Sequence, residues 1–560
     1  MFPRIFLSAI LNWALFVSRI AALNPLEIKG YKFFDSLTGE EVIIKGIDYY
    51  PRPNHGNLNQ NSMDYFTEEY SHIWQRDIPY FQFLGVNAVR LYAVNGSKNH
   101  DAFMCALEAA GIYVIVALAH DCPTCAVTRD NALPDGKCYP PELKAQGQQV
   151  INTFAKYANT LAFSAGNEVN HFAPIHKPEW NAPCQKKFTR DMREYVDSCS
   201  KHMMRKIPIG LVAADSDRWE NVMYYNCQED PEDPYEHTEW YGLNAYVDCD
   251  GRAKTYKDAL GMHSLQMSFE AYDMSIPVLL TEFGCLSDTY PTVNGYECQR
   301  NFLQAKWMLE EPGLRNQFAG GFAFEYSMEA ANAAQASPYP FKTFGKQNYG
   351  IGTWTYLVER KASPVRQELT FGLFCLKGYF SPEMCDDIET PCEYNPLPSF
   401  DFLKTAFTES NISNATLMEE FEPSQRRQGR SVCPEQFPKL NSIEWEADKH
   451  PFAQCPARKE STFTCKAHSD YRLRIGNEGA DLEFGLEAAA VLLIVLGLIC
   501  GCFKFTSYRR RVEYHILTVK ETDSQGSNES LGLMSLQGMS DPKAAYHAIE
   551  SSDSSGDGVM

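Results

Sequence analysis

The chain has 560 residues, which is too many for one ordinary hydrophobic core, so two or three domains are expected. Its composition is 44% hydrophobic and 13% aromatic, which is typical of globular protein with additional tyrosine and phenylalanine. A net charge of −20 argues against a surface for nucleic acid or anionic membranes, whereas an acidic, aromatic-rich chain suits a neutral polar ligand such as a sugar.

The N-terminus has the pattern of a signal peptide over residues 1–22. Arg4 provides a short basic region, an apolar stretch follows from Ile5 to Val17, and the small residues Ala21 and Ala22 stand where cleavage is expected. An uncleaved signal anchor is the alternative, because the apolar stretch also resembles a short membrane span. The pattern predicts that the chain after it is exported.

Short apolar stretches alternate with helix-like stretches from Val42 to Ser327, which is typical of a parallel sheet built from βα repeats. Eight strands are predicted, over residues 42–49, 88–93, 112–119, 161–167, 207–213, 240–247, 277–283 and 320–327. Residues 186–204 and 299–309 are the clearest connecting helices. Eight units of this length predict a single (β/α)8 barrel over residues 28–355. A doubly wound open sheet is the alternative, but no glycine-rich phosphate loop follows the first strand.

The alternation ends after about Gly352. Residues 356–480 have few long periodic segments and carry six cysteines, at Cys375, Cys385, Cys392, Cys433, Cys455 and Cys465. They are predicted to form a cysteine-rich module or an ordered stalk, with residues 422–430 as a linker.

A second apolar run predicts a transmembrane helix over residues 486–505. The basic residues 509–511 follow it, which places the C-terminus in the cytoplasm. A lipid-anchor signal would end with its hydrophobic tail, whereas this chain continues into a Ser-, Gly- and acid-rich tail over residues 506–560 that is predicted to be disordered. Cys500 and Cys502, at the inner membrane face, are candidates for acylation. The prediction is a single-pass protein of the cell surface or an endomembrane.

The cysteines and glycosylation sequons agree with this topology. Of the 18 cysteines, all but Cys500 and Cys502 lie on the outer side, where an oxidising compartment preserves disulfides. Three sequons lie on the same side, at Asn95, Asn411 and Asn414.

Two short segments of the tail resemble tyrosine-based sorting signals. They are residues 514–517 (YHIL) and 546–549 (YHAI), each with a tyrosine first and a bulky apolar residue last. An extended segment of this kind can add to the edge of an adaptor, with both side chains filling pockets. A cytoplasmic sorting adaptor is therefore a candidate partner. Tyr546 is a stronger candidate than Tyr514, which lies close to the bilayer.

Two glutamates stand at the carboxyl ends of predicted strands, where the catalytic groups of barrels gather. Glu168 follows the fourth strand and Glu282 ends the seventh, and these strands face each other across the barrel mouth. Such a pair suits cleavage of a glycosidic bond, in which one carboxyl protonates the leaving oxygen and the other attacks the anomeric carbon. Tyr246 and Arg90 also end strands and are candidates to keep Glu282 ionised. Asn167 is a candidate to bind a sugar 2-hydroxyl.

Seven stretches occur in one order along this region. They are residues 76–80 (RDIPY), 89–92 (VRLY), 165–169 (AGNEV), 206–210 (KIPIG), 241–246 (YGLNAY), 276–285 (IPVLLTEFGC) and 320–326 (GGFAFEY). Together they resemble the fungal-type β-1,3-glucanosyltransferases of glycoside hydrolase family 72, over about residues 28–355. The resemblance implies a (β/α)8 barrel, a retaining mechanism without a cofactor, and β-glucan as both donor and acceptor.

The resemblance also assigns roles to individual residues. It implies that Glu168 is the acid/base, that Glu282 is the nucleophile, and that Cys249 and Cys285 are bridged. The substrate-binding residues that it implies are Tyr49, Tyr50, Arg90, Tyr92, Asn167, Asn244, Tyr246 and Tyr326. The chain departs from the family pattern at Tyr50, where glutamine is usual, and at Ala117, where aspartate is usual and Asp121 follows a few residues on.

Two other functions are also compatible with the sequence. An endo-β-glucan hydrolase differs from a transglycosylase only in whether water or a sugar resolves the covalent intermediate. A carbohydrate-binding surface receptor without catalysis is the second alternative, although a degenerate barrel would be expected to lose at least one glutamate. No metal site is predicted, because His100, His120 and His171 are scattered along the chain.

Overall fold

The computed structural model describes most of the predicted barrel and part of the chain that follows it. The described residues are 23–51, 63–119, 126–127, 136–170, 181–202, 204–249, 251–328, 342–345, 348–355, 393–412, 416–429, 431–435, 437–456 and 463–465. All of them belong to the first of two compact units, Met1–Asn477. The predictions that lie outside the described residues concern the signal peptide at 1–22, the transmembrane helix at 486–505, the tail at 506–560, and Asp121, Asn414, Tyr514 and Tyr546. Of the helices that the structure describes, none is long and apolar enough to cross a membrane.

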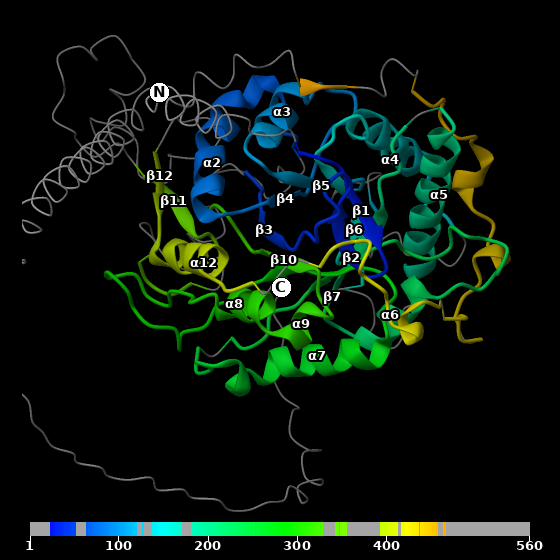
Figure 1. The fold of residues 1–560 in the computed structure, drawn as a ribbon. Coiled ribbons are helices and arrows are strands. Elements are labelled where there is room, and N and C mark those ends of the chain that lie inside the picture. The colour runs from blue at the N-terminus through cyan, green and yellow to red at the C-terminus, as the bar shows by residue number, and fades with distance from the viewer. Residues whose placement is uncertain are drawn as a thin grey trace, which may run out of the picture. The chain divides into compact units, whose positions relative to one another are not determined.

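Eight parallel strands close into a barrel, which confirms the predicted architecture (Figure 1). They are β3 (Ile44–Asp48), β4 (Ala88–Leu91), β5 (Tyr113–Ala117), β6 (Thr160–Asn167), β7 (Ile209–Ala214), β8 (Tyr241–Asn244), β9 (Val278–Phe283) and β10 (Gly320–Ala323). Gly320 of β10 pairs with Ile44 of β3, so the sheet closes and the doubly wound alternative is wrong. All eight strands overlap the predicted ranges, because a parallel strand covered on both faces is a short, nearly continuous apolar run in the sequence.

Helices surround the barrel (Figure 1). The α-helices are α2 (Ser71–Leu84), α3 (Asp101–Ala109), α4 (Pro141–Phe154), α5 (Ala182–Ser200), α6 (Arg218–Asn226), α7 (Leu260–Tyr272), α8 (Leu303–Glu310) and α9 (Pro312–Arg315). Short 3-10 helices are η2 (Glu68–Tyr70), η4 (Tyr256–Asp258), η7 (Gln425–Arg427), η8 (Leu440–Ser442) and η9 (Glu446–Lys449). The two connecting helices predicted most clearly correspond to α5 and α8.

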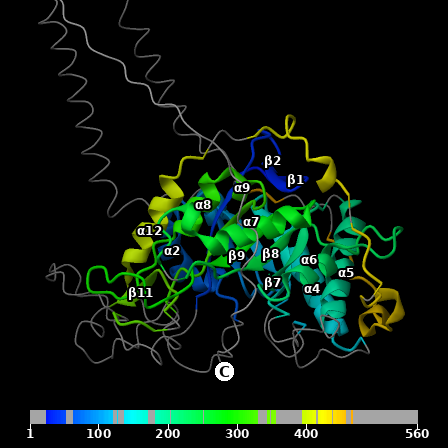
Figure 2. The ribbon, with the colours of Figure 1, turned by 90° about the horizontal axis from the view of Figure 1, so that it is seen from below.

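A hairpin covers the amino ends of the barrel strands. It consists of β1 (Leu26–Lys29) and β2 (Lys32–Asp35), which pair antiparallel. Leu26 and Phe33 from the hairpin pack in one buried cluster with residues near the strand starts, including Ile44 and Leu161. Figure 2 shows β1 and β2 together on one side of the barrel. The amino end of the barrel is thereby closed, and the carboxyl end is left for polar side chains.

Helix α2 links the barrel to the C-terminal part of the chain. Its buried apolar side chains have helical spacing and form one face: Ile73, Trp74, Ile78, Phe81 and Leu84. The helix ends at Gly85, whose φ of 75° is left-handed and suits glycine. A Cβ atom at this position would lie 2.7 Å from the Thr408 side chain, so a larger residue would push α2 away from the C-terminal segment.

The C-terminal segment was predicted to be a cysteine-rich module or an ordered stalk, and its described part packs on the barrel. β11 (Gly352–Thr355) pairs antiparallel with β12 (Glu393–Pro396), and α12 (Pro398–Thr408) follows. Phe400, Leu403 and Phe407 of α12 belong to the same buried cluster as the barrel residues. Three disulfides join this segment to barrel helices or the residues after them: Cys105–Cys465, Cys199–Cys455 and Cys227–Cys433. The segment therefore packs on the barrel as part of one core.

Residues 422–430, predicted as a linker, also contact the barrel where they are described. Arg427 is 5% exposed, lies 3.3 Å from the centre of the Tyr31 ring, and donates to the carbonyl oxygens of Met274 and Asn316 at 2.6 Å each. Farther on, the chain passes alongside α5, as the gold segment in Figure 1 shows. Arg427 thus binds carbonyls on the barrel surface, although the polar composition of the segment resembles that of a linker.

This packing predicts a stability effect on α12. Leu403 is fully buried, so Leu403→Ala should lower the free energy of unfolding by about 2–5 kcal/mol, because it leaves a cavity in the common core. Thr405 is exposed on the same helix, and Thr405→Ala should change it by less than about 0.5 kcal/mol. Denaturant unfolding of both variants measures the difference. Equal stability of the two variants would mean that α12 is not part of the core.

Candidate active site

The two glutamates singled out in the sequence lie at the carboxyl ends of facing barrel strands. Glu168 directly follows β6, and its amide donates to the Val212 carbonyl of β7 at 3.0 Å. Its φ is 48°, in the left-handed region that a non-glycine residue rarely adopts. Glu282 lies within β9, opposite Asn244 of β8. Strained backbone of the kind seen at Glu168 clusters at functional sites, so this position is a candidate for one.

Three donors converge on the Glu282 carboxylate, which is 6% exposed. Arg90 Nη1 lies 3.0 Å and the Tyr92 hydroxyl 2.7 Å from Oε1, and the Tyr246 hydroxyl lies 2.8 Å from Oε2. Burial raises the pKa of Tyr92 and Tyr246 well above the usual value, and the charge of Glu282 adds to the rise at Tyr246. Both hydroxyls therefore keep their protons and donate. A carboxylate that accepts three hydrogen bonds, one from a guanidinium, is fixed in orientation.

Arg90 carries a second carboxylate, which the sequence reasoning missed. Its Nη1 lies 3.1 Å from Oδ1 of Asp48, and both side chains are almost fully buried. Burial raises the pKa of Asp48 well above its usual value, Arg90 opposes this rise, and the charge of Glu282 adds to it. Burial opposes the charge of Arg90, but Tyr92, Asp48 and Glu282 together raise its pKa. The buried guanidinium of Arg90 thus forms ion pairs with two carboxylates. Asp48 ends the first barrel strand, the same criterion that selected Glu168 and Glu282.

Asparagines connect the two glutamates. Asn244 Nδ2 donates to Glu168 Oε1 at 2.8 Å, and its own Oδ1 accepts from the Thr281 hydroxyl at 2.8 Å. Asn167 Oδ1 accepts from Arg90 Nη2 at 2.5 Å and lies 3.3 Å from Asn244 Nδ2. The predicted site residues Arg90, Asn167 and Asn244 are therefore brought together around the pair, and the two glutamates receive different donors.

Aromatic rings line the same region. The rings of Tyr50 and Tyr92 stack with centroids 4.7 Å apart and planes inclined by 17°, and Arg90 lies over the Tyr92 ring. The half-buried Tyr349, which the sequence reasoning missed, packs 5.7 Å from the Tyr246 ring and 5.3 Å from the Phe324 ring. Sugar rings stack on tyrosine faces of this kind through their C–H groups, so the stacked pair suits a carbohydrate.

Two predicted substrate residues do not face the site. Tyr49 is 1% exposed and Tyr326 is 0% exposed, and the hydroxyls of both point to the buried Asp77, at 2.8 and 3.4 Å. Side chains alternate along a strand, so Tyr49 turns outward toward α2 because its neighbour Asp48 turns into the barrel. Tyr326 stacks on Tyr394 with ring centroids 4.4 Å apart. The structure therefore does not place Tyr49 and Tyr326 among the side chains that surround the two glutamates.

Ala117, the other position at which the chain departs from the family pattern, ends β5 and is 8% exposed. Cys249 and Cys285 form a disulfide between the loops after β8 and β9. Cys285 lies three residues after Glu282, so the bridge restrains the backbone beside that carboxylate. Within the ranges described here, no group of three or more His, Cys, Asp or Glu side chains is arranged to hold a metal ion.

A (β/α)8 barrel with a carboxylate pair at the carboxyl ends of its fourth and seventh strands has the architecture of a glycoside hydrolase. Within that class the chain belongs to the glucanosyltransferase family, glycoside hydrolase family 72, whose profile matches residues 15–336.

Named relatives and solved structures agree with this family. A 1,3-beta-glucanosyltransferase of Candida albicans, PGA4, is 31% identical over 319 residues, which are 56% of this chain and 62% of the relative. The 1,3-beta-glucanosyltransferase gas4 of Schizosaccharomyces pombe is 32% identical over 57% of this chain and 64% of the relative. The chain thus spans less than two thirds of each. A structure of Saccharomyces cerevisiae Gas2p with laminaritriose and laminaritetraose is 25% identical, with a TM-score of 0.53 over 74% of each chain.

Proposed function

We propose that the chain is a retaining β-1,3-glucan transglycosylase in which Glu282 is the nucleophile and Glu168 the acid/base. The observation that carries this assignment is the convergence of Arg90, Tyr92 and Tyr246 on Glu282. A nucleophile must be held in a fixed orientation toward the anomeric carbon, and these three donors hold both oxygens of the carboxylate. Glu168 receives a neutral amide donor from Asn244, which suits a group that must alternate between protonated and ionised forms.

The reaction follows from these two roles. Glu168 protonates the glycosidic oxygen while Glu282 attacks the anomeric carbon, which breaks the chain and forms a covalent glycosyl-enzyme intermediate. Glu168, now ionised, takes a proton from a hydroxyl of a second glucan, and that oxygen displaces Glu282 and restores the β linkage. Tyr50, stacked on the Tyr92 ring, is the aromatic side chain proposed to contact a glucan unit beside Glu282.

Relatives named as 1,3-beta-glucanosyltransferases and the laminari-oligosaccharides bound to Gas2p support β-1,3-glucan as donor and acceptor. A neutral polymer also matches a chain whose net charge is −20. Incubation of the purified protein with a single end-labelled β-1,3-oligosaccharide should yield products both longer and shorter than the substrate. The β-1,4 oligosaccharide of the same length is the linkage control. Only shorter products would instead identify a hydrolase, and no products with tight binding would identify a receptor.

The Tyr246 hydroxyl offers a graded test of the nucleophile. Tyr246→Phe removes one donor from the Glu282 carboxylate and should lower kcat by about 10- to 100-fold, the value of one hydrogen bond to a charged group. Tyr241→Phe is the matched control, because Tyr241 lies on the same segment and its buried hydroxyl has no hydrogen-bond partner among the described residues. Tyr241→Phe should leave kcat unchanged. Equal rates for the two variants would argue against Glu282 as nucleophile.

We further propose that the enzyme is a single-pass membrane protein, with a signal peptide at 1–22, a transmembrane helix at 486–505 and a cytoplasmic tail at 506–560. Five disulfides among the described cysteines support an oxidising location for the barrel, and the exposed side chains of Asn95 and Asn411 are accessible to glycosylation. Protease treatment of sealed vesicles should remove the tail and protect the barrel.

Tyr514 and Tyr546 are proposed to recruit a sorting adaptor from the cytoplasm. Replacement of Tyr546 by alanine in the full-length protein should slow internalisation from the cell surface. An unchanged rate in the double variant that also carries Tyr514→Ala would remove this role from the tail.

A further inference from the structure

Three disulfides hold the C-terminal segment on the barrel, and they share one design. In each, the cysteine on the barrel side is nearly or fully buried, at Cys105, Cys199 and Cys227. The cysteine on the segment side is half-buried in each, at Cys433, Cys455 and Cys465. The segment-side cysteine is therefore the more exposed residue of each pair. The three bonds form a natural comparison set, because their exposure and their connection to the barrel are alike.

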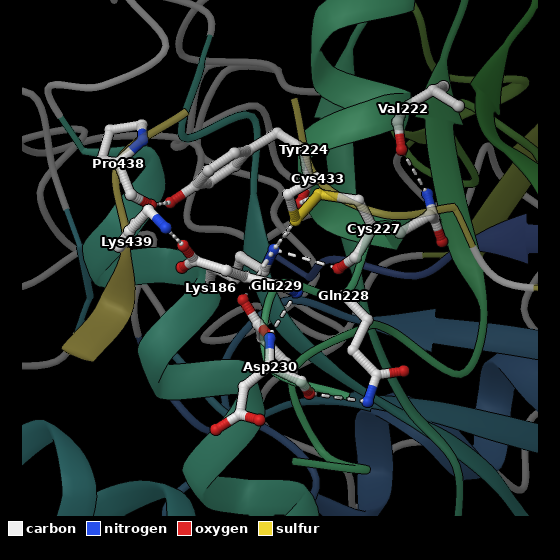
Figure 3. The surroundings of a disulfide bond; sticks show 12 residues. Lys186, Val222, Tyr224, Cys227, Gln228, Glu229, Asp230, Cys433, Pro438 and Lys439 are labelled. Atoms are coloured by element: carbon white, nitrogen blue, oxygen red, sulfur yellow. Dashed lines mark hydrogen bonds and ion pairs between the residues drawn. A yellow bond between two sulfur atoms is a disulfide. The ribbon is translucent and has the colours of Figure 1, made fainter. Parts of the chain in front are cut away.

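Lys186 distinguishes one of these bonds from the other two (Figure 3). Its Nζ, on α5, lies 3.5 Å from Cys227 Sγ, 3.4 Å from Cys433 Sγ and 3.1 Å from the Cys227 carbonyl oxygen. The Lys186 side chain is 2% exposed, and its Nζ lies 4.7 Å from the centre of the Tyr224 ring. A buried ammonium therefore donates to both sulfurs of this disulfide.

The other two disulfides of the set have no such neighbour in the part of the chain that the structure describes. The Ser198 hydroxyl lies 3.9 Å from the Cys199 sulfur, and no cationic side chain contacts the sulfurs of Cys105, Cys455 or Cys465 there. Lys187, the next residue on α5, pairs with Asp191 and Asp448 and does not contact a sulfur among its described partners. Of these two neighbouring lysines on α5, only Lys186 contacts the sulfurs of a disulfide.

We propose that Cys227–Cys433 is a site of thiol–disulfide exchange with an external dithiol, and that Lys186 is the positioning residue that favours departure of the Cys227 sulfur. A neighbouring cation stabilises a thiolate, and a leaving thiolate that is stabilised departs faster. The Cys227 sulfur is taken as the leaving atom because Cys227 is fully buried, whereas Cys433 is the more exposed residue of the pair. Glycan transfer is not involved, so this inference stands apart from the proposed function.

The exchange has two balanced steps. A thiolate of the dithiol attacks Cys433 Sγ, the Cys227–Cys433 bond breaks, and Cys227 leaves as a thiolate paired with the Lys186 ammonium. The second thiol of the reductant, as its thiolate, then attacks the sulfur of its own mixed disulfide and releases Cys433. The dithiol loses two electrons and becomes a cyclic disulfide, and Cys227 and Cys433 gain those electrons together with two protons.

The charge on Lys186 depends on pH in an accessible range. Burial lowers the pKa of Lys186 to about 8, although Glu236, Glu229 and Asp233 oppose the shift. Glu236, 3.4 Å away, is the nearest carboxylate, and Tyr224 is the aromatic group facing the ammonium. Below pH 8 the ammonium is present and the exchange is assisted. Above pH 8 the amine is neutral and the assistance is lost.

The test compares two bonds within one folded protein. The full-length protein is treated with a limiting dithiol such as dithiothreitol at pH 6.5, 7.5 and 9, and nascent thiols are alkylated and quantified by mass spectrometry. Cys227–Cys433 should be reduced about tenfold faster than Cys199–Cys455 at pH 6.5, and the ratio should fall toward one as pH rises through 8. The fraction of the reductant that is ionised to thiolate changes with pH, but it affects both bonds equally and therefore cancels in this ratio.

Variants separate the ammonium from general loosening of the segment. Lys186→Met should abolish the preference at every pH, whereas Lys186→Arg should retain it and remove its pH dependence, because guanidinium stays charged. Lys187→Met loosens the contact with Asp448 and leaves the sulfurs untouched, so it should keep the wild-type ratio. A wild-type ratio near one at pH 6.5, or one that does not change with pH, would overturn the inference without any variant.

Discussion

A chain that carries Glu282→Ala is expected to lose transglycosylation by roughly 10⁴-fold or more, because no covalent intermediate can form without the nucleophile. Azide should restore turnover with an activated glucoside, since a small anion fits the space left by the carboxylate and attacks from the same side. The azide product should have inverted configuration. Product analysis by nuclear magnetic resonance measures both the rescue and its stereochemistry.

The matching change at the other carboxyl should fail in a different way. Glu168→Ala should lower the rate on glucan by about 10²- to 10⁴-fold, the usual value of general acid–base catalysis. It should still form the glycosyl-enzyme from a substrate whose leaving group needs no protonation, and mass spectrometry should detect that intermediate. Identical behaviour of the two variants with activated substrates would contradict the assignment of roles.

Arg90→Met is expected to produce the largest loss of stability from a single change in the site. The substitution keeps the bulk of the side chain but leaves the carboxylates of Asp48 and Glu282 buried without their shared cation. Loss of one partner from a buried ion pair costs about 3–5 kcal/mol. Denaturant unfolding at pH 7 measures this loss. Arg218→Met, which breaks a half-buried pair with Asp215, is the control and should cost less than about 1 kcal/mol.

The same variant should show a pH dependence of known sign. Burial raises the pKa of Asp48, and removal of Arg90 raises it further, so the folded state binds a proton that the unfolded state has released. Stability therefore falls as pH rises above the unfolded pKa, and the deficit of Arg90→Met should be smaller at pH 4 than at pH 7. Asp48→Asn added to Arg90→Met should recover part of the lost stability without recovering activity. No recovery would show that Asp48 is not the destabilised group.

The barrel was predictable from the sequence because a buried parallel strand and its connecting helix are local patterns. The placement of Glu168 and Glu282 followed from the same patterns, since strand ends fix where catalytic side chains gather. The burial of Tyr49 and Tyr326 was not predictable, because a shift of one residue in the register of a strand moves its side chains to the other face.

Tyr349 and the C-terminal segment escaped prediction for a different reason. Tyr349 follows a long connection after β10. Arg300 links it to the site by donating hydrogen bonds to the carbonyl oxygens of Tyr349 and Phe324. Such a contact joins residues far apart in the chain and leaves no periodic signal. Cysteine count likewise indicates disulfides but does not determine their connectivity, so the ties from Cys433, Cys455 and Cys465 to the barrel were not deducible.

Those ties have a consequence for biosynthesis. Their partners are separated in sequence by 206, 256 and 360 residues, so each barrel cysteine enters the oxidising compartment well before its partner. At a synthesis rate of ~5–20 residues per second, Cys105 waits roughly 20–70 s for Cys465. During that interval Cys105, Cys199 and Cys227 are all available to one another as wrong partners. Export of the finished enzyme is therefore expected to depend on a disulfide isomerase, because mispaired cysteines must be reshuffled after the last residues of the segment emerge.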